Sequence, residues 1–335
     1  MKNALTTVTL LLLLAALFFS GCVGKKPGKR PNKKSEPNNI LVLLDWTPNT
    51  NHTGLYAALE KGWFAEEELN VTITQPPEDE ALVLVSSGKA EFAFSFQESM
   101  GPAIAKASDA LPVIAVAAII SHNTSGVMSL SGSRILRPAD LAGKRFASWE
   151  TPLVTAVIHD IVTNDGADFN TVKMVPNFAT DAFSALQTDV DAIWIYYAWD
   201  GIAAETKGID INYLDFGTID GKFDFYTPVL VCNTDWAAAN PDLAKKFLAA
   251  ASRGYNFAIE NPAEAAEILL KHAPELDRAL VMRSQEYLKT QYQADAKRWG
   301  EIDPERWGGF YQWMYEQGLL ETDIGKGGFT NEYLP

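Results

Sequence analysis

The sequence predicts an α/β fold, and three observations support that prediction. From Ile40 onward, short runs of β-branched and other apolar residues alternate with stretches of helical spacing. After Asn233 the pattern becomes helical only. The segments that follow most predicted strands are rich in aromatic and hydrogen-bonding residues, as in loops that gather around a ligand at the carboxyl ends of strands. With 335 residues, 47% hydrophobic and 21% charged, the chain is long enough for about two globular domains.

The N-terminus has the pattern of a lipoprotein signal peptide. Lys2 gives a positive start, residues 8–19 form a nearly unbroken apolar run, and Ser20 and Gly21 precede Cys22. An apolar run this short is typical of a signal peptide, since a membrane-spanning helix needs about 20 apolar residues. Small residues before a cysteine resemble the lipobox, although Phe19 stands where that motif favours leucine. We therefore expect residues 1–22 to be a signal peptide with a lipidated Cys22; an uncleaved anchor is the alternative.

Residues 23–39 predict a flexible tether. They contain six Lys or Arg and three Pro, with almost nothing to bury, and their positive charge could also contact anionic lipid headgroups. The remainder of the chain is acidic: from Ile40 onward it holds 21 of the 28 Lys and Arg but 41 of the 42 Asp and Glu, a net charge of −20. Such a body argues against a nucleic-acid partner. We expect it to work outside the cytoplasm, attached to the cell membrane by its lipid.

The strands are expected in order along the chain, as short apolar runs bounded by turn residues. They are residues 40–44, 71–74, 92–95, 113–120, 127–130, 145–147, 172–175, 192–195 and 229–232. Helical spacing lies between them at residues 53–61, 154–162 and 181–186. Further on, Asn240-Pro241 and Asn261-Pro262 each place a capping side chain before a proline, which predicts helices over residues 242–259 and 263–272. A last helix is expected over residues 305–317.

Six loops at strand ends carry the candidate binding residues. Flat aromatic faces combined with amide and carboxylate groups suit a planar heteroaromatic ligand, whereas any one such loop alone could simply cap the core. The stacking candidates are Trp46, Trp149, Tyr196 and Trp199, and the amides expected to orient the ligand are Asn49, Gln97 and Asn123. Glu98 or Glu150 is expected to accept a hydrogen bond from a ring amine. The remaining candidates are His52, Thr151, Tyr197, Asp200 and Tyr226.

The charge of these loops bears on the ligand. They contain no Lys or Arg, so an anionic ligand is disfavoured and a neutral or basic one preferred. His52 is as suited to orienting its loop as to touching ligand. The two cysteines, Cys22 and Cys232, and four scattered histidines offer no metal-ligand spacing, so no metal or cofactor is expected. Cys232 is expected to be a buried core thiol.

Four stretches of the chain resemble the solute-binding proteins of the thiamine-pyrimidine family. They are LLDWTPNTNHTGLYAALEKGWF (residues 43–64), FSFQES (94–99), AAIISHNTSG (117–126) and FTNEYLP (329–335). The resemblance covers about residues 39–335. It implies a two-lobed periplasmic-binding-protein fold of type II that closes by hinge motion, with lobe 1 at residues 40–126 and 228–335 and lobe 2 at 127–227. It also implies a monomeric carrier that delivers formylaminopyrimidine or hydroxymethylpyrimidine, precursors in thiamine biosynthesis, to an ABC permease.

The same family contains a pyrimidine synthase that uses pyridoxal phosphate, a histidine donor and a cysteine-rich iron site. Aligned on its motif, Ser95 stands in place of the cofactor lysine and Ser99 in place of the donor histidine, and the cysteine-rich run retains only Cys232. Schiff-base chemistry needs an amine, so we expect a carrier without catalytic residues. The aromatic segment 196–200 keeps a larger ligand such as riboflavin open, and a sensory lipoprotein that binds the same ligand is a third alternative.

Overall fold

The computed structural model describes residues 38–75, 81–176 and 182–335, and residues 37–335 form one compact unit. The predictions for the signal peptide, for lipidated Cys22 and for the tether lie outside the described residues. Within the described ranges, no helix is both long and apolar enough to cross a membrane.

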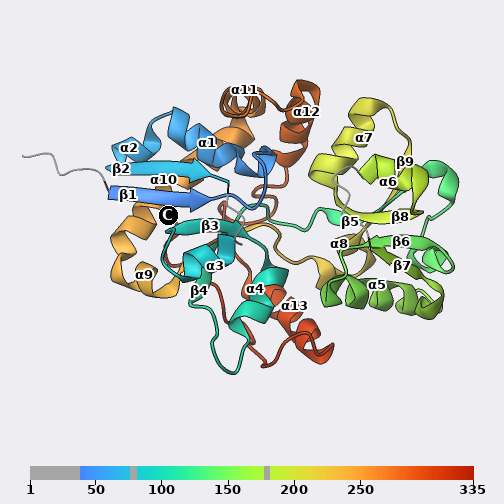
Figure 1. Ribbon diagram of the computed structural model, residues 1–335. Helices are drawn as coiled ribbons and strands as arrows, with labels where there is room; N and C mark the ends of the chain where they lie inside the picture. Colours follow the sequence, from blue (N-terminus) through green and yellow to red (C-terminus); the bar gives the residue numbers. More distant parts are fainter. Residues whose placement is uncertain (1–37, 76–80, 177–181) are drawn as a thin grey trace, which may run out of the picture. The chain divides into compact units, whose positions relative to one another are not determined.

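The first of two five-stranded sheets has the order β2-β1-β3-β10-β4 (Figure 1). β1 (Asn38–Leu43) pairs in parallel with β2 (Leu69–Thr74) and β3 (Phe92–Ser95). β10 (Val229–Asn233) runs antiparallel between β3 and β4 (Val113–Ala118). The sheet therefore takes its fourth strand from a part of the chain more than 100 residues beyond the other four.

The second sheet has the order β7-β6-β8-β5-β9. β6 (Arg145–Ser148) pairs in parallel with β7 (Lys173–Pro176) and β8 (Ala192–Tyr196). β5 (Ser125–Leu130) runs antiparallel to β8 and to β9 (Ile211–Asp215). The chain crosses between the sheets twice, through residues 119–124 and back through residues 216–228.

Helices cover both faces of each sheet, because alternate strand residues point to opposite sides. In β1, Ile40 and Val42 join a core cluster with α1 and α10, whereas Leu43 joins a second cluster with α3 and α13. The first set of helices is α1 (Thr53–Glu60), α2 (Trp63–Glu66), α3 (Ala81–Ser86), α4 (Gln97–Ile104), α9 (Thr234–Ala239), α10 (Pro241–Glu260), α11 (Pro262–His272), α12 (Arg278–Leu288) and α13 (Pro304–Glu316). The second sheet carries α5 (Pro152–Asn164), α6 (Ala182–Thr188), α7 (Ile202–Lys207) and α8 (Phe216–Ile219).

The predicted α/β fold is confirmed, and most predicted elements are present with ends shifted by a few residues. The helices expected over residues 242–259, 263–272 and 305–317 are α10, α11 and α13. The strand expected over 113–120 ends at Ala118, because residues 119–120 already belong to the crossing. β9 was not predicted: it is a short edge strand with all five residues only half-buried, and its sequence INYLD is not a continuous apolar run. The lobe boundaries expected near Gly126 and Thr227 remain predictions.

Candidate ligand-binding cleft

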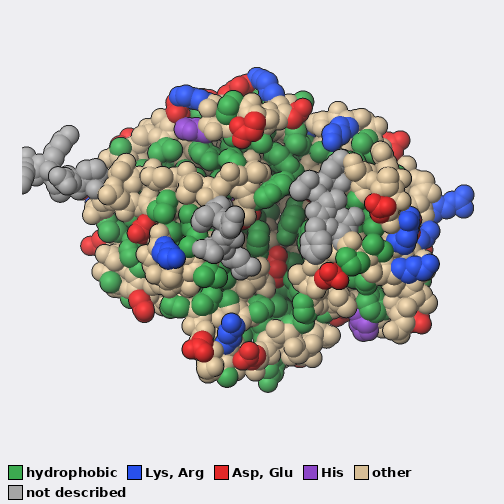
Figure 2. All heavy atoms as spheres, in the orientation of Figure 1, with side chains coloured by type: hydrophobic (Ala, Val, Ile, Leu, Met, Phe, Trp, Pro, Cys, Tyr) green, Lys and Arg blue, Asp and Glu red, His purple; other side chains and the backbone are tan. Residues whose placement is uncertain are grey.

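Two adjoining cavities lie where the strand-end loops of the two sheets meet, and they share Phe96 and Tyr196. We call the smaller one, of about 260 Å³, the Asp45 chamber; it is lined by Asp45, Trp46, Asn49, Thr50, Asn51, Phe96, Ile120, Thr124, Tyr196, Ala198, Trp199, Asp200, Thr227 and Pro228. We call the larger one, of about 550 Å³, the Glu98 chamber; it is lined by Phe96, Glu98, Ser99, Pro102, Trp149, Thr151, Pro152, Leu153, Val154, Trp194, Tyr196, Met314, Gly318 and Leu319. Figure 2 shows hydrophobic side chains along the groove at the centre of the view, with acidic atoms at its base.

Glu98 is a buried carboxyl in the first turn of α4. Thr227 donates a hydrogen bond to Glu98 Oε1 at 3.3 Å, and Oε2 is buried without a hydrogen-bond partner of its own among the described residues. Burial raises the pKa of Glu98 to about 8, although a backbone amide and the hydroxyls of Thr227 and Tyr196 offset part of that effect. At neutral pH the carboxyl is therefore mainly protonated, and it can both donate and accept a hydrogen bond.

Tyr196 stands between the two chambers at the end of β8. Burial, together with the nearby Glu98 carboxyl, raises the pKa of its hydroxyl well above the usual value, so the hydroxyl stays protonated. Asp45 and Asp200 act on the same hydroxyl more weakly. Tyr196 thus lines both chambers, and its side chain carries both a ring and a protonated hydroxyl.

His52 holds Asp45 in place. Its Nδ1 accepts a hydrogen bond from the Asn49 amide at 3.1 Å, so the ring proton must be on Nε2, which lies 2.6 Å from Asp45 Oδ1. The imidazole is fully buried and packs edge-on against Phe94. A backbone amide can only donate, so His52 is the neutral tautomer and donates to the Asp45 carboxylate. His52 therefore orients this loop and lies outside the lining of both chambers.

The cleft exposes two large aromatic rings on opposite sides. Trp46 follows β1 and is 49% exposed, and Trp149 follows β6 and is 38% exposed. Single exposed rings are common on protein surfaces, but each of these two lines a cavity, where it can stack on a ligand. The ring centroids of Trp149 and Trp194 lie 6.2 Å apart, and the Trp194 Nε1 is buried without a partner among the described residues. These two rings therefore form an aromatic wall, and the Trp194 N–H is a donor that a ligand could use.

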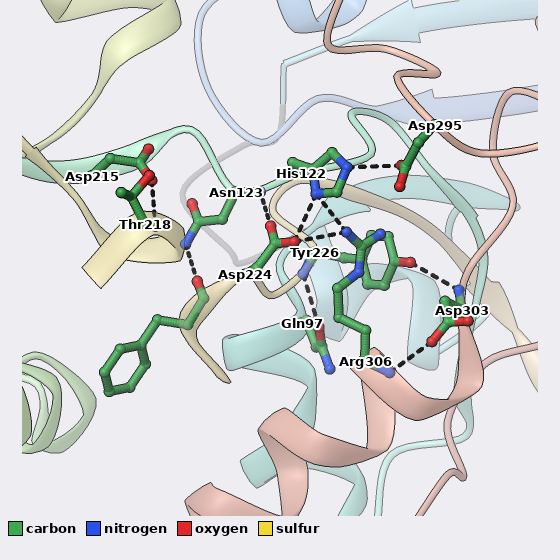
Figure 3. Close-up of polar contacts among 11 residues, drawn as sticks. Gln97, His122, Asn123, Asp215, Thr218, Asp224, Tyr226, Asp295, Asp303 and Arg306 are labelled. Carbon is green, nitrogen blue, oxygen red and sulfur yellow. Dashed lines mark hydrogen bonds and ion pairs between the residues drawn. The ribbon is translucent and has the colours of Figure 1, made fainter. Parts of the chain in front are cut away.

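Three predicted site residues, Gln97, Asn123 and Tyr226, lie outside both chambers. Their hydrogen bonds link the two crossings to neighbouring segments of the chain (Figure 3). Gln97 Oε1 accepts from the Tyr226 amide at 2.9 Å, and its Nε2 donates to the Trp307 carbonyl. Asn123 bonds the Phe223 carbonyl and the Ser125 amide, each at 2.8 Å. These side chains fix the geometry of the crossings, and Tyr226 in addition accepts from the Asp303 amide at 2.8 Å.

Two further predicted site residues, Tyr197 and Glu150, also lie outside both chambers. Tyr197 packs against Tyr213 and Tyr287 and donates to Glu205. Glu150 lines a separate open depression beside α5. The predicted residues that the fold brings together at the chambers are Trp46, Asn49, Glu98, Trp149, Thr151, Tyr196, Trp199 and Asp200.

A charged network occupies the other side of the crossings. His122 lies 2.6 Å from Asp224 and 2.8 Å from Asp295, and Arg306 lies 2.9 Å from Asp224 (Figure 3). The hydrogen bond that His122 donates to Asp224 is the main reason why the pKa of His122 is raised; Asp295 adds to this effect, and burial and Arg306 oppose it. The network joins both crossings to the start of α13.

Many lining residues of the two chambers, Asp45 among them, were not predicted as site residues from the sequence. Phe96 lies inside the FSFQES motif, but Thr124, Thr227 and Pro228 belong to the crossings and not to strand-end loops. Strand-end position is the only signal that selected candidates from the sequence. Residues that reach the cleft through a crossing carry no such signal.

With this geometry in view, the chain can be compared with known proteins. The family described as NMT1/THI5 like matches residues 49–265. A formylaminopyrimidine-binding protein of Halalkalibacterium halodurans is 29% identical, over 93% of this chain and 94% of that protein. A 4-amino-5-hydroxymethyl-2-methylpyrimidine phosphate synthase of Legionella pneumophila is 25% identical, over 73% of this chain and 77% of that protein.

Among solved structures, the periplasmic aliphatic sulphonate-binding protein SsuA of Escherichia coli matches with a TM-score of 0.67 and 16% identity, over 87% of this chain and 96% of that one. SsuA of Xanthomonas axonopodis bound to MOPS matches with a TM-score of 0.65 and 14% identity, over 87% and 97%. At these identities the likeness establishes the fold, which is the two-lobed periplasmic-binding-protein fold.

Proposed function

The chain belongs to the NMT1/THI5-like family, and from that premise we propose that it is the extracytoplasmic solute-binding lipoprotein of an ABC importer. Its ligand is a small planar heteroaromatic, formylaminopyrimidine or hydroxymethylpyrimidine, on the route to thiamine. The solute-binding fold and the relative named for binding formylaminopyrimidine support this proposal. The chain acts as a monomer that hands its ligand to the permease.

The observation that carries the proposal is the raised pKa of the Glu98 carboxyl and its unpaired Oε2. An aminopyrimidine presents a ring nitrogen that accepts and an amino group that donates, side by side. A protonated carboxyl has the matching pair, since Oε2 donates while Oε1 retains accepting capacity beside the Thr227 bond. Two hydrogen bonds to one edge fix the ring in orientation while Trp149 and Tyr196 offer their faces.

A larger ligand is the second candidate, and one observation favours it. The two chambers meet at Phe96 and Tyr196, so a fused ring system such as riboflavin could span both. A synthase activity is disfavoured, because Ser99 lines the Glu98 chamber and Ser95 ends β3 at the positions of the synthase's histidine and lysine. Neither hydroxyl can form a Schiff base or serve as a pyrimidine nitrogen donor.

Membrane attachment through Cys22 completes the proposal. A lipid on Cys22 and the basic segment 23–39 keep the binding body near its permease. Replacing Cys22 by Ser should release the protein from the membrane fraction without changing ligand affinity. Retention of the variant in membranes would favour an uncleaved anchor.

The test of the ligand is mass spectrometry of small molecules released by denaturing the purified protein, followed by calorimetric titration. Hydroxymethylpyrimidine or formylaminopyrimidine recovered and bound at micromolar affinity or tighter supports the proposal. Riboflavin would keep the carrier role and replace the ligand. A protein that binds none of these, with unchanged tryptophan fluorescence, would contradict the proposed function.

A further inference from the structure

The Asp45 chamber differs chemically from the Glu98 chamber, although the two adjoin. Two carboxyl side chains, Asp45 and Asp200, line it, whereas no Lys or Arg does so among the described residues. The rings of Trp46, Trp199 and Tyr196 line it as well. Carboxylates combined with aromatic faces are the usual surroundings of a bound organic cation.

The charge of Asp45 is not balanced by its nearest partner. Since the Asn49 amide occupies His52 Nδ1, His52 is neutral and supplies a hydrogen bond without a positive charge. The Asp45 side chain is only 9% exposed, so water solvates this carboxylate poorly. A poorly solvated anion that has a neutral hydrogen-bond partner attracts a cationic ligand group strongly.

A separate polar atom also points to a ligand in this chamber. Thr124 is 3% exposed and lines the cavity, and its Oγ1 has no hydrogen-bond partner in the described parts of the chain. Buried hydroxyls are nearly always paired, so an unpaired one at a cavity wall indicates a polar occupant. Its lone pairs can accept from an ammonium group, and its proton can be donated to a ligand oxygen.

We propose that the Asp45 chamber binds a positively charged substituent on the pyrimidine, so that the carrier accepts aminopyrimidines with a cationic group and binds them more tightly than the neutral pyrimidines named above. This inference rests on the proposed function, because it places the pyrimidine ring at Glu98. Tyr196 separates the two chambers and lines both, so a substituent on the ring passes directly from one to the other. The cation is a primary ammonium or a quaternary heterocycle, since both fit a carboxylate flanked by aromatic rings.

The experiment compares three ligands by calorimetric titration of the purified full-length protein. They are neutral hydroxymethylpyrimidine, aminomethylpyrimidine with its primary ammonium, and thiamine with its quaternary thiazolium. We expect at least one cationic ligand to bind at least about tenfold more tightly than the neutral one, as for a charge-assisted contact. Which of the two cations gains affinity identifies the kind of group.

The variant Asp45→Asn isolates the charge, because His52 Nε2 can still donate to the Asn oxygen. It should weaken cation binding at least about tenfold more than it weakens binding of hydroxymethylpyrimidine. The matched control is Asp235→Asn, which removes an exposed carboxylate in the first turn of α9, beyond the end of β10 that faces away from the cleft. It should change no affinity.

The outcomes separate this inference from the function on which it rests. Equal or tighter binding of the neutral pyrimidine, or equal losses for all three ligands in Asp45→Asn, overturns the cation chamber and leaves the pyrimidine carrier standing. Failure of these three ligands and of formylaminopyrimidine to bind overturns both.

Discussion

Thr227 donates a hydrogen bond to Glu98 Oε1 at 3.3 Å, which joins the return crossing between the sheets to the first turn of α4. Glu98 also lines the larger chamber, and Thr227 lines the smaller one. A ligand bound at Glu98, as we propose, would act on a side chain already tied to the return crossing. We expect any closing movement of the two lobes and recognition of the ring to share this one contact.

The first prediction concerns the stability of the unliganded protein. Because the pKa of Glu98 is raised to about 8 in the folded protein, the folded state binds more protons than the unfolded chain between about pH 4.5 and 8. Stability should therefore fall as pH rises through that window, by an amount on the order of a few kcal/mol. Glu98→Gln should reduce the fall in stability between pH 5 and pH 8, measured by urea unfolding, by that amount.

A matched control is Glu275→Gln, which neutralises an exposed glutamate outside both chambers. It should leave the pH dependence as in the wild-type protein. If Glu98→Gln behaves like the control, Glu98 ionises normally and the neutral carboxyl at the cleft is wrong.

The second prediction concerns the aromatic walls. Trp149→Ala and Trp199→Ala should each weaken binding of the natural ligand at least about tenfold, because each removes a stacking contact of about 1–3 kcal/mol. Tyr315→Ala is the control, since Tyr315 is 43% exposed on α13 and lines neither chamber. Titration followed by tryptophan fluorescence or calorimetry measures the change. Unchanged affinity in both Trp variants would place the ligand elsewhere.

The third prediction concerns the charged network at the crossings. Asp224 raises the pKa of His122 above its ordinary value of 6.5, so the network stabilises the folded protein fully below about pH 6.5 and loses that stabilisation as pH rises through the folded pKa. The stability difference between wild type and His122→Gln should therefore be largest near pH 5.5 and shrink at higher pH. The contribution of Glu98 cancels in this difference. His159→Gln, at an exposed histidine, should show no such trend, and a pH-independent difference for His122→Gln would contradict the assignment.

The fourth prediction concerns the packing that holds the Asn49 loop. At Gly254 in α10, an added Cβ would lie 1.9 Å from the Gly54 carbonyl oxygen of α1, so Gly254→Ala must push the two helices apart. We expect a loss of at least about 1–3 kcal/mol in the free energy of unfolding. Gly309→Ala in α13 has open space and should instead stabilise by about 0.5–1 kcal/mol. Equal effects of the two substitutions in thermal unfolding would show that the close approach is absent.

Local pattern was enough to predict the α/β class and the starts of two C-terminal helices. Asn240 and Asn261 stand before prolines at the starts of α10 and α11. The predicted side-chain caps are wrong, because each asparagine amide instead donates to a carbonyl of the preceding helix, Asn240 to Trp236 and Asn261 to Phe257. β9 escaped prediction because its five residues, INYLD, mix polar and apolar side chains and form no continuous apolar run. Its pairing with β5 depends on a strand 80 residues earlier, which no local window contains.

Some residues of the candidate site could likewise be predicted from the sequence, and others could not. Trp46, Trp149 and Trp199 could be selected because they follow apolar strands, and strand ends gather at one edge of a sheet. Gln97 and Asn123 follow strands equally well, yet their amides bond backbone groups of the crossings and the C-terminal helices. Sequence position cannot distinguish these outcomes, because the partner that uses the amide lies 100 to 210 residues away.

The sequence by itself determined the class of fold, the acidic body, the basic N-terminal segment and the family, since each depends on residue type and short-range order. Only the tertiary structure decided that the Glu98 carboxyl is desolvated and its pKa raised, that His52 is a neutral partner of Asp45, and that Tyr196 lines both chambers. Protonation and cavity shape arise from desolvation and from contacts between distant segments. Both exist only after the two sheets have been brought together.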